Sequence, residues 1–400
     1  MSVNNYFDNG ATSFPKPPEV AEEISRYLNE LGGPYGRSFY GRALEVSRVV
    51  EETRDLVASQ LGISDGGKIV FTANATQGIN TVIKGFVDRS APCEVWISKL
   101  EHNAVTRPLY QLEQQKKINI KYLPSLSDGK IDIKELARTD LSGADLIVLC
   151  HQSNVNGLVQ PVEKIRAAIG KTPILLDCAQ SAGHITIKAE EWDVDYLAFT
   201  GHKGLLGPTG TGGLYIKDNV ELQPLINGGT GSRSESWETP DFMPDRFEAG
   251  TPNIAGIFGL YGALNNYPEP RHGREDFITL LNSISELPGI KVHRARDIED
   301  QGELFSITSS FADPSAFGMA LYDAWGIETR LGLHCAPLAH KTIKTFPEGT
   351  IRIAPSPYHG LEDFEHLKKA LTSISEDFLR KNSSKTTAKV PEKQTDQGTL

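Results

Sequence analysis

Short apolar runs alternate with helical patterns between residues 66 and 217. Apolar runs of four to six residues, bounded by turn residues, indicate buried strands, and their alternation with helices predicts a mostly parallel sheet. The predicted strands span residues 68–72, 94–98, 119–123, 145–150, 173–177, 196–199 and 213–216. Because a parallel sheet is covered on both faces, we expect an α/β fold with a seven-stranded sheet and helices on either side.

Two amphipathic helices are predicted ahead of these strands, over residues 18–31 and 43–61. In the second helix the apolar residues lie near one face, and Gly62 is placed to cap its C-terminal end. We assign these apolar positions to the core or to an interface.

The pattern changes after residue 268, where helices and strands suggest a smaller α+β domain. The predicted helices span 269–287, 314–325 and 361–379, and the predicted strands span 290–293, 304–309 and 350–354. We therefore expect an N-terminal segment (1–17), a large domain (18–267) and a small domain (268–380). Residues 381–400 contain lysine, serine, threonine and glutamine without an aromatic residue, which is typical of a disordered tail.

Composition narrows the class of protein. The hydrophobic content of 39% and the charged content of 23% are ordinary for a globular enzyme. The net charge of −10 argues against nucleic acid or an anionic membrane as a partner. No apolar run reaches the ~20 residues needed to span a bilayer, and the first residues lack the pattern of a signal peptide. We expect a cytoplasmic protein.

Cysteine usage is consistent with a cytoplasmic protein. The four cysteines include no Cys-x-x-Cys pair and suggest neither a disulfide framework nor a metal site. Cys150 and Cys178 end apolar runs and are expected to be buried thiols. Cys335 instead lies beside His334 in residues 330–338, where glycine and proline predict a loop. A loop thiol near histidine can be a nucleophile, although this segment alone favours an incidental cysteine.

Lys203 carries the clearest chemical signal. It follows the apolar run Tyr196-Leu-Ala-Phe and has glycines close on both sides. An amine among apolar and small residues loses its proton readily and can bond covalently to an aldehyde, whereas a solvated lysine in a glycine-rich turn is the alternative. Asp177 ends another apolar run, and pyridoxal phosphate enzymes need a carboxylate to keep the pyridine nitrogen protonated. The pair therefore predicts a pyridoxal phosphate site.

Two further segments suit this cofactor. The small, polar run Ala73-Asn-Ala-Thr opens a predicted helix, whose free N–H groups and dipole can bind a phosphate. Ordinary helix capping by Asn74 or Thr76 is the other interpretation. His102 follows a predicted strand, where an imidazole can stack on a flat ring or move protons, although a lone histidine usually does neither.

Together these segments resemble the class V aminotransferase superfamily, and within it the cysteine desulfurases and selenocysteine lyases of the shorter-loop group. The resemblance covers nearly all of residues 5–375. It rests on Tyr6-Phe-Asp-Asn-Gly-Ala-Thr, Thr72-Ala-Asn-Ala-Thr-Gln-Gly-Ile-Asn, Glu101-His-Asn-Ala, His151-Gln-Ser-Asn-Val-Asn-Gly, Asp177-Cys-Ala-Gln-Ser-Ala-Gly-His, Thr200-Gly-His-Lys, Arg246-Phe-Glu-Ala-Gly-Thr-Pro-Asn and Arg330-Leu-Gly-Leu-His-Cys-Ala.

This resemblance implies the fold type I of pyridoxal phosphate enzymes and assigns roles around the cofactor ring. Lys203 would bond the cofactor covalently and later move protons. Asp177 would pair with the pyridine nitrogen, Gln180 would bond the ring oxygen, and His102 would stack on the ring.

The resemblance also implies a phosphate site and a homodimer. Ala75, Thr76, Thr200 and His202 would bind the phosphate. Thr251 would reach the phosphate of the neighbouring subunit, so that the active sites are shared between subunits.

The remaining implied roles concern the substrate. Asn154 and Arg352 would hold the carboxylate of L-cysteine, and Cys335 would accept its sulfur as a persulfide, with alanine as the product. Whether His334 or Arg330 activates Cys335 stays open, as does the identity of a sulfur-acceptor protein. The family's usual residues are replaced at Tyr358-His359-Gly360.

Other functions remain as alternatives. The first is a selenocysteine lyase or another C–S lyase that releases selenide or sulfide. A class V aminotransferase has no need of a thiol at residue 335. A catalytically silent scaffold that binds pyridoxal phosphate would be favoured by loss of Lys203, Asp177 or Cys335, and all three are present.

Overall fold

The computed structural model describes residues 3–36, 38–87, 92–218 and 220–387. Its larger sheet has the strand order β1-β7-β6-β5-β4-β2-β3. The strands are β1 (Ile69–Thr72), β2 (Cys93–Ile97), β3 (Ile118–Tyr122), β4 (Leu146–Cys150), β5 (Ile174–Asp177), β6 (Tyr196–Thr200) and β7 (Gly212–Ile216). Strand β7 runs antiparallel to both of its neighbours, β1 and β6, and the remaining strand pairs of the described sheet are parallel, so the prediction of a mostly parallel seven-stranded sheet is confirmed.

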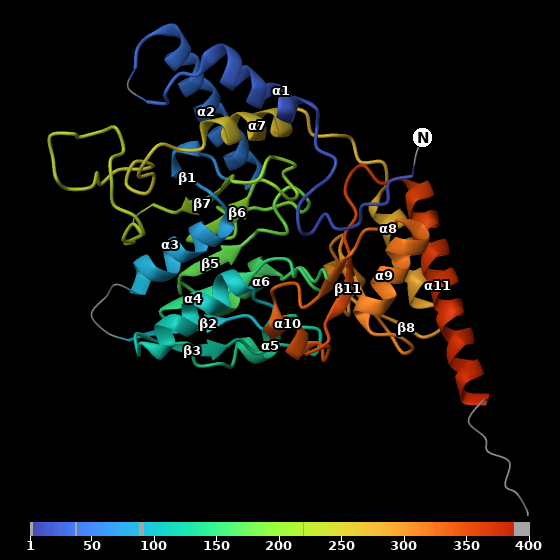
Figure 1. Cartoon of the computed structure of the whole chain (residues 1–400). Coiled ribbons are helices and arrows are strands. Elements are labelled where there is room, and N and C mark those ends of the chain that lie inside the picture. The colour runs from blue at the N-terminus through green and yellow to red at the C-terminus, as the bar shows by residue number, and fades with distance from the viewer. Residues whose placement is uncertain (1–2, 37, 88–91, 219, 388–400) are drawn as a thin grey trace, which may run out of the picture.

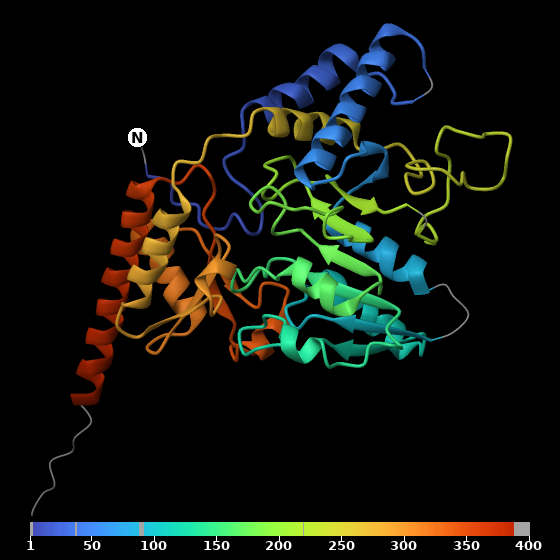
Figure 2. The same ribbon diagram turned by 180° about the vertical axis from the view of Figure 1, so that it is seen from behind.

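Helices cover both faces of this sheet. On one face lie α3 (Ala75–Val87) and α4 (Asn103–Gln114), and on the other lie α5 (Ile133–Leu136) and α6 (Val162–Ile169), as the two opposite views show (Figures 1 and 2). Successive strand residues point to opposite faces. Two separate apolar cores result, and neighbouring residues of β4 such as Val148 and Leu149 belong to different ones.

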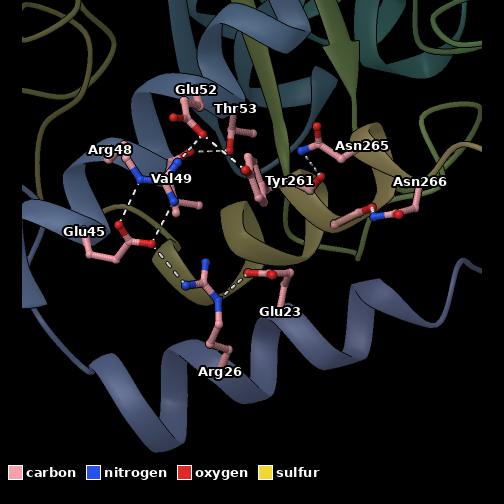
Figure 3. Close-up of polar contacts among 11 residues, drawn as sticks. Glu23, Arg26, Glu45, Arg48, Val49, Glu52, Thr53, Tyr261, Asn265 and Asn266 are labelled. Atoms are coloured by element: carbon pink, nitrogen blue, oxygen red, sulfur yellow. Dashed lines mark hydrogen bonds and ion pairs between the residues drawn. The ribbon is translucent and has the colours of Figure 1, made fainter.

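A third layer of helices lies beside β1 and is formed by α1 (Glu19–Arg26), α2 (Gly41–Gln60) and α7 (Ile254–Asn265) (Figure 1). After Arg26 the chain continues as a π-helical turn (Tyr27–Leu31), where the sequence predicts one regular helix. An ion pair between Arg26 and Glu45 at 3.1 Å joins α1 to α2, and Arg48 contacts the same Glu45 from within α2 at 2.7 Å (Figure 3).

The second sheet is antiparallel, with the order β10-β11-β9-β8. Its strands are β8 (Ile290–His293), β9 (Phe305–Ser309), β10 (Arg330–Gly332) and β11 (Thr350–Ile353), and its helices are α8 (Arg274–Ser285), α9 (Pro314–Trp325), α10 (Pro337–Thr342) and α11 (Leu361–Thr387). Short 3₁₀ turns occur at Gly66–Lys68 and Ile298–Asp300. This arrangement confirms the smaller α+β part expected after residue 268.

Three expectations for this part need correction. The helix predicted from residue 269 begins at Arg274, because the prolines at 268 and 270 cannot continue a helix and Asp276 caps the N–H of Gly273. Residues 330–332, expected in a loop, form β10. Helix α11 continues through Thr387, so residues 381–387 of the predicted tail are helical. Residues 388–400 lie outside the described part of the chain, and the domain limits at 17 and 267 stay predictions.

The N-terminal strap, defined here as residues 5–16, lies against both sheets. The N–H of Phe7 donates to the carbonyl of Glu328 at 2.9 Å, beside the smaller sheet. The N–H of Ser13 donates to the carbonyl of His202 at 3.0 Å, beyond β6 of the larger sheet. The strap therefore joins the two parts of the molecule. None of the helices in the described residues combines the length and hydrophobicity needed to cross a bilayer.

Candidate active site

A cavity opens at the carboxyl ends of β4, β5 and β6, where the helices α3 and α4 begin. In open α/β sheets this edge is the usual place for a ligand. The cavity is lined by Asn74, Ala75, Thr76, Ile79, His102, Ala104, Cys150, Gln152, Asn154, Asp177, Ala179, Gln180, Thr200, His202 and Lys203. It thus brings together nine of the predicted site residues, namely Ala75, Thr76, His102, Asn154, Asp177, Gln180, Thr200, His202 and Lys203.

Asp177 is the last residue of β5, in register with Cys150 of β4 and Ala198 of β6. Its carboxylate is buried and accepts a hydrogen bond from the N–H of Ala179 at 2.9 Å. Burial raises its pKa, while the N–H of Ala179 and the charge of Lys203 oppose the shift. A buried carboxylate in this position is stabilised by a cationic partner.

Lys203 lies in the turn that follows β6. Burial lowers the pKa of its amine to about 8, the charge of Arg352 acts in the same direction, and Asp177 opposes them. A lysine with such a pKa is partly neutral near pH 7.5 and is therefore a nucleophile.

His102 forms the N-cap of α4, and its Nδ1 accepts a hydrogen bond from the N–H of Ala104 at 3.0 Å. In the neutral ring the proton is therefore on Nε2. Burial lowers the pKa of His102 to about 4, with the charges of Lys203 and Arg352 adding to the effect. The ring facing the cavity is a neutral imidazole, which is suited to stacking.

The N-terminal end of α3 is suited to binding an anion. Asn74 caps the helix by accepting a hydrogen bond from the N–H of Gln77 at 2.9 Å, so the capping interpretation is correct for Asn74. The other N–H groups of the first turn, at Ala75 and Thr76, have no partner within the helix. Nearby, Nδ1 of His202 is buried without a hydrogen-bond partner in the described residues. Helix capping by Asn74 and phosphate binding at the same helix end are therefore compatible.

Arg352 and Asn154 lie at the boundary with the smaller sheet. Arg352 is 3% exposed, and its Nη2 contacts Asp8 Oδ1 at 2.8 Å while Nη1 donates to the carbonyl of Asn154 at 3.2 Å. Its Nε and the Oδ1 atom of Asn154 are buried and find no partner within the described part of the chain. Because buried polar atoms are normally hydrogen-bonded, Nε–H of Arg352 is placed to bind an acceptor such as a carboxylate, whereas Oδ1 of Asn154 is suited to a donor.

Cys335 is exposed and lies in a short loop between β10 and α10. The N–H of Asn103 donates to its carbonyl at 2.7 Å, so the loop is attached to the start of α4. Cys335 and His102 line one cavity, together with Arg107. The thiol therefore lies close to the residues that line the Lys203 cavity.

The structure describes the two neighbours of this thiol that the sequence left as candidate activators. His334 is buried, its Nε2 lies 2.9 Å from Thr350 Oγ1, and burial lowers its pKa to about 2. Arg330 lies on β10, opposite Arg352 in the register. In the described residues no hydrogen bond joins either side chain to Cys335.

Thr251 is not brought into the Lys203 cavity. It is exposed and lines a separate cavity with Gln77, Gly210 and Glu248, on the other side of the start of α3. Its predicted role concerns the neighbouring subunit, so this placement leaves that role as a prediction.

Three residues at the site were not singled out from the sequence. Cys150 is buried as predicted, but it also lines the Lys203 cavity, and its position at a strand end beside Asp177 was the available signal. Asp8 contacts Arg352, and the carbonyl of Gly10 accepts a hydrogen bond from Gln180 Nε2 at 2.8 Å. No local pattern marks these long-range contacts.

Comparisons with known proteins show which family this chain belongs to and which proteins it is similar to. Residues 5–367 match the family model described as aminotransferase class-V. The chain is 31% identical over 384 residues to a probable cysteine desulfurase of Methanothermobacter thermautotrophicus, covering 92% of this chain and 94% of that protein. It is 27% identical over 401 residues to a cysteine desulfurase of Wigglesworthia glossinidia brevipalpis, covering 95% of each.

Solved structures agree. The apo structure of cysteine desulfurase from Thermococcus onnurineus superposes with a TM-score of 0.85 at 26% identity, covering 93% of this chain and 94% of that one. The cysteine desulfurase CsdA from Escherichia coli gives a TM-score of 0.82 at 27% identity, with the same coverage.

Proposed function

We infer that this chain, which belongs to the class V aminotransferase family, is a pyridoxal phosphate-dependent cysteine desulfurase. It converts L-cysteine to L-alanine and carries the sulfur on Cys335 as a persulfide. The observation that carries the proposal is one arrangement of three groups: a buried carboxylate and an amine at adjacent strand ends, with an exposed thiol on a loop attached to α4.

The donor set fits pyridoxal phosphate. Asp177 would hold the ring nitrogen, Lys203 would hold the aldehyde carbon, and His102 would stack on the ring. Gln180 would bond the ring oxygen. When bound, the cofactor accepts the electrons left on Cα after the substrate loses a proton.

The phosphate would bind at the first turn of α3, at Ala75 and Thr76, with Thr200 and His202 beside them. Free N–H groups and the helix dipole favour an anion there. The unpartnered Nδ1 of His202 supports this role, since a phosphate oxygen would supply its missing partner.

Three residues would bind L-cysteine and move its Cα proton. The guanidinium of Arg352 binds the planar α-carboxylate of L-cysteine. Asn154 assists through Nδ2, which has a second hydrogen besides the one it donates to the carbonyl of His334. The partly neutral amine of Lys203 takes the proton from Cα and returns a proton to the product. Positioning Cα beside this amine is the main contribution of the carboxylate clamp.

Sulfur transfer needs the thiolate of Cys335. Its Sγ forms a bond with the substrate sulfur as the bond between that sulfur and Cβ breaks, and the released electron pair stays with the carbon side. Protonation of that carbon then yields alanine. L-cysteine and the Cys335 thiol thus give L-alanine and a Cys335 persulfide, without an external oxidant.

We propose that the protein is a homodimer, and the position of Thr251 supports this. This residue lies outside the Lys203 cavity of its own chain, and it is exposed. The same region carries the exposed side chains of Trp237 and Phe242. We propose that the segment packs on a second copy, where Thr251 binds the phosphate. All four cysteines are free, and we place the reaction in the reducing cytoplasm.

The direct test incubates purified protein with L-cysteine and quantifies alanine, pyruvate and sulfide, with mass spectrometry of Cys335. We expect alanine together with a mass increase of one sulfur atom on Cys335. Lys203→Ala is the control for cofactor chemistry and Cys335→Ala for transfer. Pyruvate and free sulfide without the modified cysteine would instead establish a C–S lyase.

A further inference from the structure

We propose that Asp8 is a positioning residue for the substrate carboxylate: it holds the guanidinium of Arg352 by one edge and leaves Nε–H free for the substrate. The inference rests on the proposed function, because that function makes Arg352 the carboxylate clamp. Asp8 belongs to the N-terminal strap, far from Arg352 in the chain.

Contacts on two edges and one face fix the guanidinium. Nη2 contacts Asp8 Oδ1 at 2.8 Å, and Nη1 donates to the Asn154 carbonyl at 3.2 Å. Gly10 closes one face, because a Cβ atom at that position would lie 2.9 Å from Arg352 Cζ and 3.0 Å from Nε. Any side chain at residue 10 would therefore displace the guanidinium. Within the described part of the chain, Nε is the guanidinium nitrogen that has no hydrogen-bond partner.

Charge gives Asp8 a second effect. Arg352 is almost fully buried, and burial lowers its pKa while Asp8 raises it. A buried cation without a counterion is strongly destabilised. Asp8 supplies that counterion before the substrate arrives, so the guanidinium does not need to turn toward another acceptor.

The strap also ties this clamp to the Lys203 turn. Gln180 Nε2 donates to the carbonyl of Gly10 at 2.8 Å, and the carbonyl of His202 accepts from both Ser13 N and Ser13 Oγ. Asp8 lies between these attachments and the smaller sheet, where the N–H of Phe7 is bonded. The position of the carboxylate clamp is therefore set relative to the residue that takes the Cα proton.

The test compares two probes on the cofactor-loaded protein. L-Alanine carries the α-carboxylate, and ethylamine is the same molecule without it. Binding of each is measured by calorimetry and by the change in cofactor absorbance. Asp8→Ala is expected to weaken L-alanine binding about tenfold to a hundredfold, the range for a lost charged hydrogen bond, and to leave ethylamine binding unchanged. The KM for L-cysteine should rise by a similar factor, with a smaller change in kcat.

Three further variants separate positioning from general loosening of the strap. Asp8→Asn keeps an oxygen acceptor without the charge and should lose less than Asp8→Ala. Gly10→Ala keeps Asp8 but displaces the guanidinium, and should also weaken L-alanine selectively. Asn9→Ala is the matched control, because the Asn9 amide donates to the carbonyls of Tyr6 and Ala354 and not to Arg352. Melting temperatures identify any variant that fails to fold.

Equal weakening of both probes by Asp8→Ala, or selective loss of L-alanine in Asn9→Ala, would overturn the inference. A wild-type protein that bound the two probes alike would overturn it as well. The two proposals can also fail separately. If the wild-type protein formed no alanine from L-cysteine, while Asp8→Ala still lost selectivity for L-alanine over ethylamine, the desulfurase reaction would be refuted and the role of Asp8 supported.

Discussion

Removing Arg54 should destabilise the protein far more than removing any surface arginine. The Arg54 side chain is 1% exposed on α2, and it contacts both carboxylate oxygens of Glu248, at 2.7 and 3.2 Å. Arg54 Nη1 also donates to the carbonyl of Ile69 at 2.6 Å, and Glu248 accepts the N–H of Phe71 at 2.6 Å. This buried pair attaches the segment that carries Thr251 to β1.

The magnitude follows from what each substitution leaves behind. Arg54→Met leaves the Glu248 carboxylate buried without a cation, which costs about 3–5 kcal/mol. Glu248→Gln in the wild-type background removes a charged acceptor and costs about 1–3 kcal/mol. In the Arg54→Met background the same Glu248→Gln change removes the unpaired charge, and its amide oxygen can still accept the N–H of Phe71. Its effect should therefore change sign and raise stability.

Urea unfolding of the four proteins measures this directly, at one protein concentration and with saturating cofactor, because bound ligands and subunits contribute to apparent stability. Arg26→Met is the control. Arg26 is 28% exposed in its pairs with Glu23 and Glu45 in Figure 3, so its loss should cost at most about 1 kcal/mol. If Glu248→Gln lowered stability equally in both backgrounds, the reasoning about the buried charge would be refuted.

Three other predictions concern the reaction. Covalent capture of pyridoxal phosphate by the cofactor-free protein should accelerate as pH rises through about 8, because only the neutral amine of Lys203 attacks; stopped-flow absorbance showing a flat profile from about pH 7 to 9 would contradict the lowered pKa. Cys335→Ala should abolish alanine formation from L-cysteine and spare much of that from L-selenocysteine, whose carbon–selenium bond is weaker, whereas full activity with L-cysteine would exclude the persulfide step. Thr251→Ala should lose cofactor on gel filtration. In a mixed dimer of one Thr251→Ala protomer and one Lys203→Ala protomer, one site has both residues intact, so activity should return in that site. If no activity returned, Thr251 would belong to the site of its own subunit.

The larger sheet and its chemistry could be predicted because both depend on local patterns. Strands buried on both faces are continuous apolar runs. Asp177 is the last residue of one such run and Lys203 comes shortly after another, so both could be located from the sequence. Strand β10 has only three residues and exists through its pairing with β11, so its sequence carries no periodic signal. The contact between Asp8 and Arg352 likewise joins distant parts of the chain, and only the folded strap brings the two together.

The Cys335 loop shows how a residue with an ambiguous sequence signal acquires a structural role. His334 and Cys335 both have left-handed backbone angles, with φ of 48° and 56°, and such residues cost about 1–3 kcal/mol each unless their surroundings hold them. The His334 ring is held by Thr350, and its carbonyl accepts a hydrogen bond from Asn154 Nδ2 at 2.7 Å.

His334 therefore holds the loop in place through its ring and its carbonyl. Asn154 supports this loop through its side chain and the guanidinium of Arg352 through its carbonyl. One residue thus fixes both the group proposed to bind the substrate carboxylate and the loop proposed to accept its sulfur. A change at Asn154 should for this reason disturb substrate binding and sulfur transfer together, whereas a change at Cys335 should disturb transfer alone.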